Sequence, residues 1–190
     1  MKSSALVVIA TVALATIARS QNPETGADAS AQTAADILRE AAGTDIAFLA
    51  AGLLKSSYNR EDLATILEYP ADEVVIVNLT GAQIKQAMER SLQFLPQPNS
   101  SFLQLSGMDV TFNRSAPSLN RVININVGSA KLDESKSYSV AMPANLGRGA
   151  LGYFKVWDKA KIAKTLPKSL EDILRGKKAA DSSPRWQSQG

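Results

Sequence analysis

The stretch at residues 73–93 constrains the fold more than any other part of the chain. Residues 73–79, EVVIVNL, are rich in β-branched side chains and predict a buried strand. Thr80 and Gln83 have the spacing of a capping box, which starts a helix directly after that strand. Apolar side chains then recur at helical spacing, at Ile84, Ala87, Met88 and Leu92. A strand that passes at once into an amphipathic helix must bury a face of each, so the chain needs further layers around it.

The other predicted elements surround this unit with helices early and paired strands late. We expect a helix over 31–42 that stops at Gly43, and a short helix over 60–67 capped by Asn59. The remaining predicted elements are strands at 45–49, 102–112, 121–127 and 138–142 and a helix at 168–175. Gly107 interrupts the strand at 102–112 and predicts a bulge or a bend there. This order is typical of a single α+β domain without internal repeats.

The first 20 residues have the pattern of a cleavable secretory signal. Lys2 precedes an apolar run, and small residues stand at Ala18 and Ser20, just before the expected cleavage point. An uncleaved anchor is the alternative, but the run is shorter than the roughly 20 residues that a spanning helix needs. We therefore expect an exported protein, periplasmic or extracellular, with no stable membrane anchor. Four segments follow: a signal peptide at 1–20, a flexible linker at 21–30, one domain at 31–176 and a disordered tail at 177–190.

The chain of 190 residues contains neither cysteine nor histidine. This excludes disulfides, thiolate or imidazole metal sites, a cysteine nucleophile and a Ser-His-Asp triad. Removal of residues 1–20 reduces the 21 basic residues to 19, against 18 acidic ones. Nine of those 19 lie in residues 155–190, so no basic face for nucleic acid is expected across the fold.

Three local patterns allow a functional and a structural interpretation. Gly147, Gly149 and Gly152 have the GxGxxG spacing, but aromatic residues follow instead of a helix, which argues against a dinucleotide site. Tyr153, Phe154 and Trp157 could form a base-stacking platform, although such a cluster is more often core. Acids such as Glu89 and Asp109 lack ligand spacing, so no metal or cofactor and no catalytic residue is expected.

The order of motifs is specific. The chain reads ADILREAAGTDIAFL at 35–49, VVIVNLTGAQ at 74–83, FLQLSG at 102–107 and YSVA at 138–141, before a glycine-rich loop that ends in Gly152-Tyr153. This succession, over residues 31–155, resembles the C-terminal domain of the 5'-nucleotidase / UDP-sugar hydrolase / 2',3'-cyclic phosphodiesterase family. The resemblance implies a layered sandwich of mixed sheets and helices.

In that family an N-terminal metallophosphatase domain holds two metal ions through His, Asp and Asn, and the C-terminal domain recognises the substrate. The resemblance therefore implies that the catalytic half is absent here, because residues 1–30 leave no room for it and the chain has no histidine. The recognition positions also depart from the family pattern. Lys55 replaces the arginine of Asn-Ala-Gly-Gly-Xaa-Arg, and residues 143–146, Pro-Ala-Asn-Leu, lack the stacking ring.

The residues implied for substrate binding are Lys55, Tyr69, Arg148 and Tyr153. Gly52, Gly149, Gly152 and Tyr153 match the family pattern and are expected to hold the fold. Two functions follow as expectations. The first is an accessory or substrate-recognition module, non-catalytic alone, for nucleotide hydrolysis by a separately encoded metallophosphatase. The second is a free-standing nucleotide- or nucleoside-binding protein with a degenerate pocket.

Overall fold

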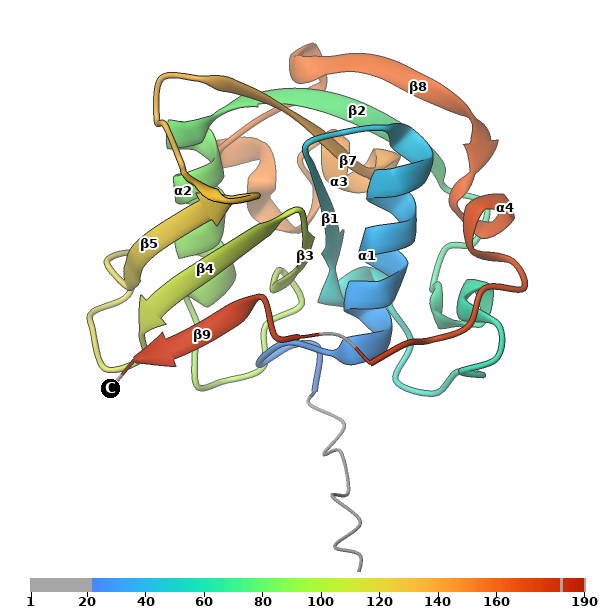
Figure 1. Ribbon diagram of the computed structural model, residues 1–190, viewed down its shortest axis with the longest axis horizontal. Helices are drawn as coiled ribbons and strands as arrows, with labels where there is room; N and C mark the ends of the chain where they lie inside the picture. The colour runs from blue at the N-terminus through green and yellow to red at the C-terminus, as the bar shows by residue number, and fades with distance from the viewer. Residues whose placement is uncertain (1–21, 182, 190) are drawn as a thin grey trace, which may run out of the picture.

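Two mixed β-sheets and the helices packed on them form the protein in the computed structural model, which describes residues 22–181 and 183–189 (Figure 1). The helices are α1 (Ala29–Ala42), α2 (Gly81–Leu92), α3 (Ala144–Gly147) and α4 (Leu170–Leu174), with 3₁₀ turns η1 (Ala51–Leu53), η2 (Leu63–Ile66), η3 (Ala150–Lys155) and η4 (Lys159–Lys161). The strands are β1 (Ile46–Ala50), β2 (Glu73–Thr80), β3 (Leu103–Ser106), β4 (Met108–Asn113), β5 (Val122–Val127), β6 (Ala130–Lys131), β7 (Ser137–Pro143), β8 (Ile162–Ser169) and β9 (Trp186–Gln189). The expected layered architecture of mixed sheets and helices is confirmed.

The five-stranded sheet, in the order β3-β1-β7-β2-β8, divides the apolar interior into two cores. Side chains alternate across a strand, so Ala47 and Leu49 of β1 face one core while Ile46 and Phe48 face the other. The first core holds α1, η2 and α4. The second is closed by α2, α3 and the four-stranded sheet β6-β5-β4-β9. All five residues of β1 are buried, as expected for a strand covered on both faces.

The predicted unit of strand, capping box and helix is present. The Thr80 hydroxyl accepts a hydrogen bond from the Gln83 amide at 3.2 Å, and the Gln83 side chain accepts one from the Thr80 amide at 3.1 Å. The apolar residues at helical spacing in α2 are buried: Ile84, Ala87, Met88 and Leu92. Local sequence therefore specifies this part of the fold.

Gly107 is the point where the chain leaves one sheet for the other. The sequence predicts one strand over 102–112 with a bend; the structure has β3 in the five-stranded sheet and β4 in the four-stranded sheet. Gly107 has a φ of 78°, and a Cβ there would lie 2.1 Å from the carbonyl oxygen of Asp45. Only glycine allows this turn and this close approach.

The prediction of a flexible linker at residues 21–30 is wrong for the residues that the structure describes, because hydrogen bonds hold them to the domain. The Gln104 amide donates to the carbonyls of Pro23 and Gly26 at 3.0 and 2.9 Å. The Asp28 amide donates to Gln104 Oε1 at 3.0 Å, and the Asp28 carboxylate caps α1, which begins at Ala29 and not at residue 31. The lead-in is held by a side chain about 80 residues away in sequence, a contact that no local pattern reveals.

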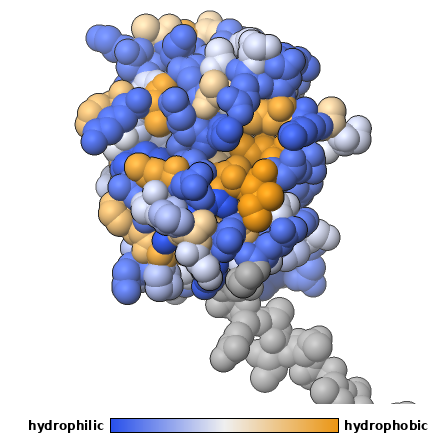
Figure 2. All heavy atoms as spheres, turned by 90° about the vertical axis from the view of Figure 1, so that its left-hand side faces the viewer, coloured by the Kyte–Doolittle hydropathy of each residue, from blue (hydrophilic) through white to orange (hydrophobic). Residues whose placement is uncertain are grey.

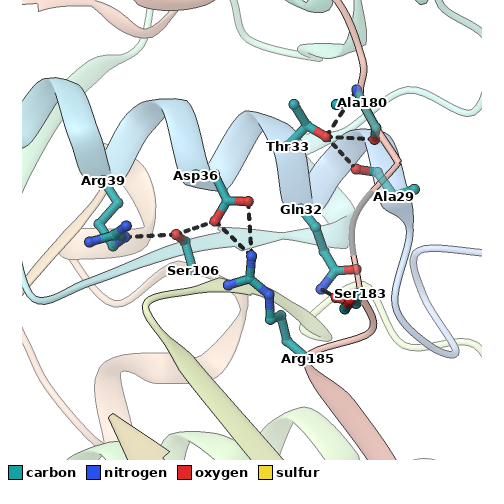
Figure 3. Close-up of polar contacts among 9 residues, drawn as sticks. All are labelled: Ala29, Gln32, Thr33, Asp36, Arg39, Ser106, Ala180, Ser183 and Arg185. Atoms are coloured by element: carbon teal, nitrogen blue, oxygen red, sulfur yellow. Dashed lines mark hydrogen bonds and ion pairs between the residues drawn. The ribbon is translucent and has the colours of Figure 1, made fainter. Parts of the chain in front are cut away.

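The prediction of a disordered tail at residues 177–190 is also wrong for the described residues of that segment. The chain runs along α1 and adds β9 beside β4 as a parallel strand. Arg185 forms an ion pair with Asp36 at 3.0 Å, and Asp36 also accepts from Ser106, whose Oγ accepts from Arg39 Nε at 2.9 Å (Figure 3). Trp186 is 6% exposed and donates from its indole nitrogen to the carbonyl of Leu103 at 2.9 Å.

Three smaller predictions also need correction. The helix expected over 60–67 is only the 3₁₀ turn η2, capped by Asp62 and not by Asn59. The helix expected over 168–175 is α4, shorter at both ends, with Ser169 as its cap. The strand β8 is not predicted because half of its residues are polar without regular alternation and it contains Pro167; both features suit an edge strand. The predicted signal peptide, residues 1–20, lies outside the described residues; within 22–181 and 183–189 no helix has the length and apolarity to cross a membrane.

Candidate functional site

Several loops meet at one end of the five-stranded sheet. The parallel strands β1 and β7 both end there, and β2 and β3, antiparallel to them, both begin there. The Gly52 amide donates to the Ser100 carbonyl at 2.8 Å, and a Cβ on Gly52 would lie 2.8 Å from Ser100 Cβ and 3.4 Å from Leu151. Loops at the carboxyl ends of parallel strands commonly hold ligands in open α/β sheets, so this end is the candidate site.

An open cleft of about 760 Å³ lies between the N-terminal lead-in and the loop that follows β1. Lys55 lies in its wall, with its amide held by the carbonyl of Ile66 at 2.7 Å. The half-buried Tyr58 contributes an aromatic ring. The other lining residues are Asn22, Pro23, Glu24, Asp28, Ala51, Gly52, Leu54, Ser56, Ser57, Ile66 and Glu68.

Acidic groups outnumber basic ones in this cleft. Among the described residues that line the cleft, Lys55 is the single basic one, whereas Glu24, Asp28 and Glu68 are acidic. Asp28 is 6% exposed, and its Oδ1 accepts from the amide of Ala31 at 2.8 Å as the α1 cap. The Glu24 and Glu68 carboxylates make no hydrogen bond or ion pair with another described residue. The cleft is therefore a region of negative potential.

Arg148 lies at the same end of the sheet but not in the cleft. Its guanidinium forms an exposed ion pair with Glu73 at 3.3 Å. The neighbouring Asp72 accepts from the Asn145 amide at 3.4 Å. Partial burial raises the pKa of Asp72, although the hydrogen bond from Asn145 and the charge of Arg148 oppose this effect. Tyr69, 55% exposed, precedes Asp72 on the loop before β2.

Tyr153 is not available to a ligand, so its prediction as a binding residue is wrong. Its ring is fully buried and stacks on Trp157, with centroids 4.6 Å apart and planes at 14°. Its hydroxyl donates to the Ser101 carbonyl at 2.6 Å, and burial raises its pKa far above the usual range. The structural role expected for Tyr153 thus explains its position. Of the three aromatic residues at 153–157, Tyr153 and Trp157 are buried in the core, whereas Phe154 is 65% exposed.

The glycine-rich loop holds an arginine of this chain. Gly149 and Gly152 have φ values of 91° and 81°. Arg90 Nε donates to the carbonyl of Leu151 at 3.1 Å, and a Cβ on Gly152 would lie 2.1 Å from Arg90 Nη2. Gly152 is needed because the guanidinium packs against its backbone, whereas a Cβ on Gly149 would lie 2.7 Å from Phe154 Cα and one on Gly147 would lie 2.5 Å from Val75 Cγ2. These close approaches are a structural reason for the GxGxxG spacing.

The structure thus brings Lys55, Tyr69 and Arg148 to one end of the sheet and buries Tyr153 behind them. The sequence does not predict Tyr58, Glu24, Asp28 or Glu68 as site residues. Two of these are in the supposed linker, and no motif marks the others. Within residues 22–181 and 183–189, no group of three or more Asp or Glu side chains is placed to hold a metal ion.

Comparison with protein families gives a match over most of the chain. The family model described as "5'-nucleotidase, C-terminal domain" matches residues 8–158. The match begins within the predicted signal peptide and ends before β8, so β8, α4 and β9 lie beyond it.

Relatives in sequence carry related names and are much longer. A "5'-nucleotidase-related protein" of Glossina morsitans morsitans is 35% identical over 129 residues, which are 61% of this chain and 23% of that protein. The 5'-nucleotidase of Mus musculus is 29% identical over 107 residues, 52% of this chain and 18% of that protein. The chain therefore spans less than a quarter of either relative.

Solved structures show the same fold at low sequence identity. A 5'-nucleotidase precursor from Thermus thermophilus aligns with a TM-score of 0.74 and 20% identity, over 90% of this chain and 38% of that one. The NAD nucleotidase of Haemophilus influenzae aligns with a TM-score of 0.69 and 16% identity, over 90% of this chain and 36% of that one. In motif order, fold and family match alike, the chain belongs to the 5'-nucleotidase C-terminal domain family.

Proposed function

We propose that this protein is an accessory or substrate-recognition module, without catalytic activity of its own, for nucleotide hydrolysis by a separately encoded metallophosphatase. The observation that supports the proposal is the site: a fold shared with 5'-nucleotidase structures carries an open cleft of about 760 Å³ at the loop end of its five-stranded sheet. The loop end of the sheet, with its cleft at Lys55, remains open to a ligand in this chain.

The face at the left of Figure 1 has the features of a surface that binds a partner protein. It carries α2 and β5, and Figure 2 shows apolar patches on it, interrupted by hydrophilic side chains. A groove of about 650 Å³ runs along α2, with Leu119, Val122 and Val156 in its wall. Leu119 is 58% exposed and has a φ of 65°, a strained backbone for leucine. Exposed apolar surface of this kind is typical of protein interfaces, and we assign it to the metallophosphatase.

The test is reconstitution with a metallophosphatase domain that lacks its own C-terminal half. We expect co-elution at micromolar concentration and a gain in AMP hydrolysis on mixing. Leu119→Ser should weaken both, whereas Glu40→Gln, an exposed change on α1, should weaken neither. Absence of association would refute the split enzyme.

A free-standing nucleotide- or nucleoside-binding protein is the second candidate. The cleft favours it, because the Tyr58 ring, two serine hydroxyls and Lys55 line one concave surface. Calorimetric titration with AMP, adenosine and UDP-glucose tests it directly. No heat and no thermal shift with any of the three would reject this candidate.

Export is the third part of the proposal. The N-terminal pattern supports it, and one relative, 30% identical over 101 residues, is a snake venom 5'-nucleotidase of Macrovipera lebetinus. Mass spectrometry of protein recovered outside the cytoplasm should find a chain that begins at Gln21. A secreted or membrane-bound chain that keeps residue 1 would contradict cleavage.

A further inference from the structure

Three sites in the sequence have the pattern Asn-Xaa-Ser/Thr, the acceptor for N-linked glycosylation. They begin at Asn78, Asn99 and Asn113. In a secreted protein this acceptor is expected on a surface loop, because the attached oligosaccharide is bulky and must extend into solvent. The fold places the three asparagines in different environments and so selects among them.

Asn99 is unsuitable because it belongs to the packed interior. It is 5% exposed, and its Nδ2, the atom that would carry the sugar, donates to the Ser91 carbonyl at 3.0 Å. Its Oδ1 accepts from the amide and the hydroxyl of Ser101 at 2.9 and 2.6 Å. An oligosaccharide on this nitrogen has no path to solvent, so a chain glycosylated at Asn99 cannot reach the native packing.

Asn78 is exposed but lies inside a sheet. It belongs to β2, which is paired with β7 on one side and with β8 on the other. The hydroxyl of its acceptor pattern, on Thr80, accepts from the Gln83 amide at 3.2 Å as the cap of α2. This site therefore offers a paired, extended backbone and an engaged hydroxyl instead of a surface loop.

Asn113 has the features that the other two sites lack. It ends β4, and Arg114 and Ser115 are exposed in the turn that leads to β5, at the lower left of Figure 1. The Asn113 Oδ1 accepts from the Ser115 amide at 2.8 Å, which forms an Asx turn. Neither Asn113 Nδ2 nor the Ser115 hydroxyl makes a hydrogen bond with another described residue, so both groups are accessible to an enzyme.

We infer that Asn113 is an N-glycosylation site and that Asn78 and Asn99 stay unmodified. The donor is an oligosaccharide linked to a polyprenyl diphosphate, and the catalyst is the oligosaccharyltransferase of the secretory pathway. The Asn113 side-chain nitrogen bonds to the anomeric carbon of the first sugar and loses one proton. The bond from that carbon to the diphosphate oxygen breaks, and polyprenyl diphosphate leaves. This inference rests on the export proposed above, because only an exported chain meets this enzyme.

Secretion of the full chain from cultured mammalian cells tests the inference. We expect a single glycosylated form whose electrophoretic mobility shifts after peptide-N-glycosidase treatment, with aspartate found by mass spectrometry in place of Asn113. The shift should be lost in Asn113→Gln and in Ser115→Ala, and kept in Ser115→Thr, which preserves the acceptor pattern. The matched control Asn120→Gln makes the same change on an exposed residue of the same hairpin, outside any acceptor pattern, and should keep the shift.

The possible results separate this site from export. A secreted chain without a glycan at Asn113 would overturn the inference while export stands. A glycan at Asn78 or Asn99 would overturn the selection of a single site by the fold. If residues 1–20 fail to direct export, a signal peptide of known function in their place delivers residues 21–190 to the same enzyme, and a chain that is then secreted without a glycan at Asn113 would refute the site itself.

Discussion

Trp186 decides whether the C-terminal segment is part of the folded domain. Its indole is 6% exposed, lies 5.0 Å from the Phe102 ring and 6.0 Å from the Phe112 ring between centroids, and donates to the Leu103 carbonyl. A buried tryptophan removes roughly 150–250 Å² from water. At about 25 cal/mol per Å² this is worth roughly 4–6 kcal/mol as an upper estimate. Large-to-small substitutions of this type typically cost about 3–5 kcal/mol.

We therefore expect Trp186→Ala to lower the free energy of unfolding by about 4 kcal/mol. Urea titration followed by far-UV circular dichroism measures this change, and Trp157 remains as a fluorescent probe of the second core. Trp186→Phe keeps the ring contacts but loses the indole hydrogen bond, and should cost only about 1–2 kcal/mol. Gln187→Ala, an exposed change in the same strand, should stay within about 0.5 kcal/mol.

Deletion of residues 177–190 is the complementary experiment. Because β9 also contributes ladder hydrogen bonds and the Arg185–Asp36 ion pair, the deletion should destabilise at least as much as Trp186→Ala. A loss below about 1 kcal/mol in both variants would refute the reasoning, since burial of a tryptophan cannot be that weak. The segment would then be the disordered tail that its composition suggests.

Three further substitutions test other parts of the structure. Gly107→Ala should cost at least about 2 kcal/mol by urea titration, because its Cβ would meet the Asp45 carbonyl at a positive φ; a cost below about 0.5 kcal/mol, the size of a neutral surface change, would contradict the sheet switch. Tyr153→Phe should cost about 1–2 kcal/mol by leaving the buried Ser101 carbonyl unpaired, with ligand affinity unchanged; altered affinity would return Tyr153 to the site. The folded-state pKa of Asp72 is raised, so its contribution to stability is present below its unfolded pKa and is lost as pH rises through the folded value. Asp72→Asn should therefore raise stability at pH 7 by roughly 0.5 kcal/mol or less, discounted for its partial exposure, and not at pH 3; an equal gain at both pH values would exclude ionisation as the cause.

The sequence predicts those elements whose reasons are local. The Thr80–Gln83 capping box and the apolar stripe of α2 lie within a few residues of each other, and propensity and spacing suffice for both. Gly107 predicts a bend because a glycine inside a strand pattern usually indicates a bulge or a bend. No local pattern predicts that the chain changes sheets there, since this depends on the Asp45 carbonyl, which lies just before β1.

The candidate site is predicted less completely. Motif order leads to Lys55, Tyr69 and Arg148, because these residues follow or precede recognisable strands. Tyr153 follows from the same motif, yet its exposure depends on Trp157 and Ser101, which only packing brings together. Glu24 and Glu68, which give the cleft its charge, carry no signal in the sequence.

The sequence by itself determines the class of fold, the unit of β2 and α2, the absence of cysteine and histidine chemistry, and the family resemblance that the comparisons confirm. The tertiary structure decides what lies beside what: the lead-in held by Gln104, β9 placed on β4, and three carboxylates gathered around Lys55. The physical reason is the distance in sequence over which each interaction acts. Propensity and capping act within one or two turns, whereas burial and charge depend on groups that approach only when distant segments pack.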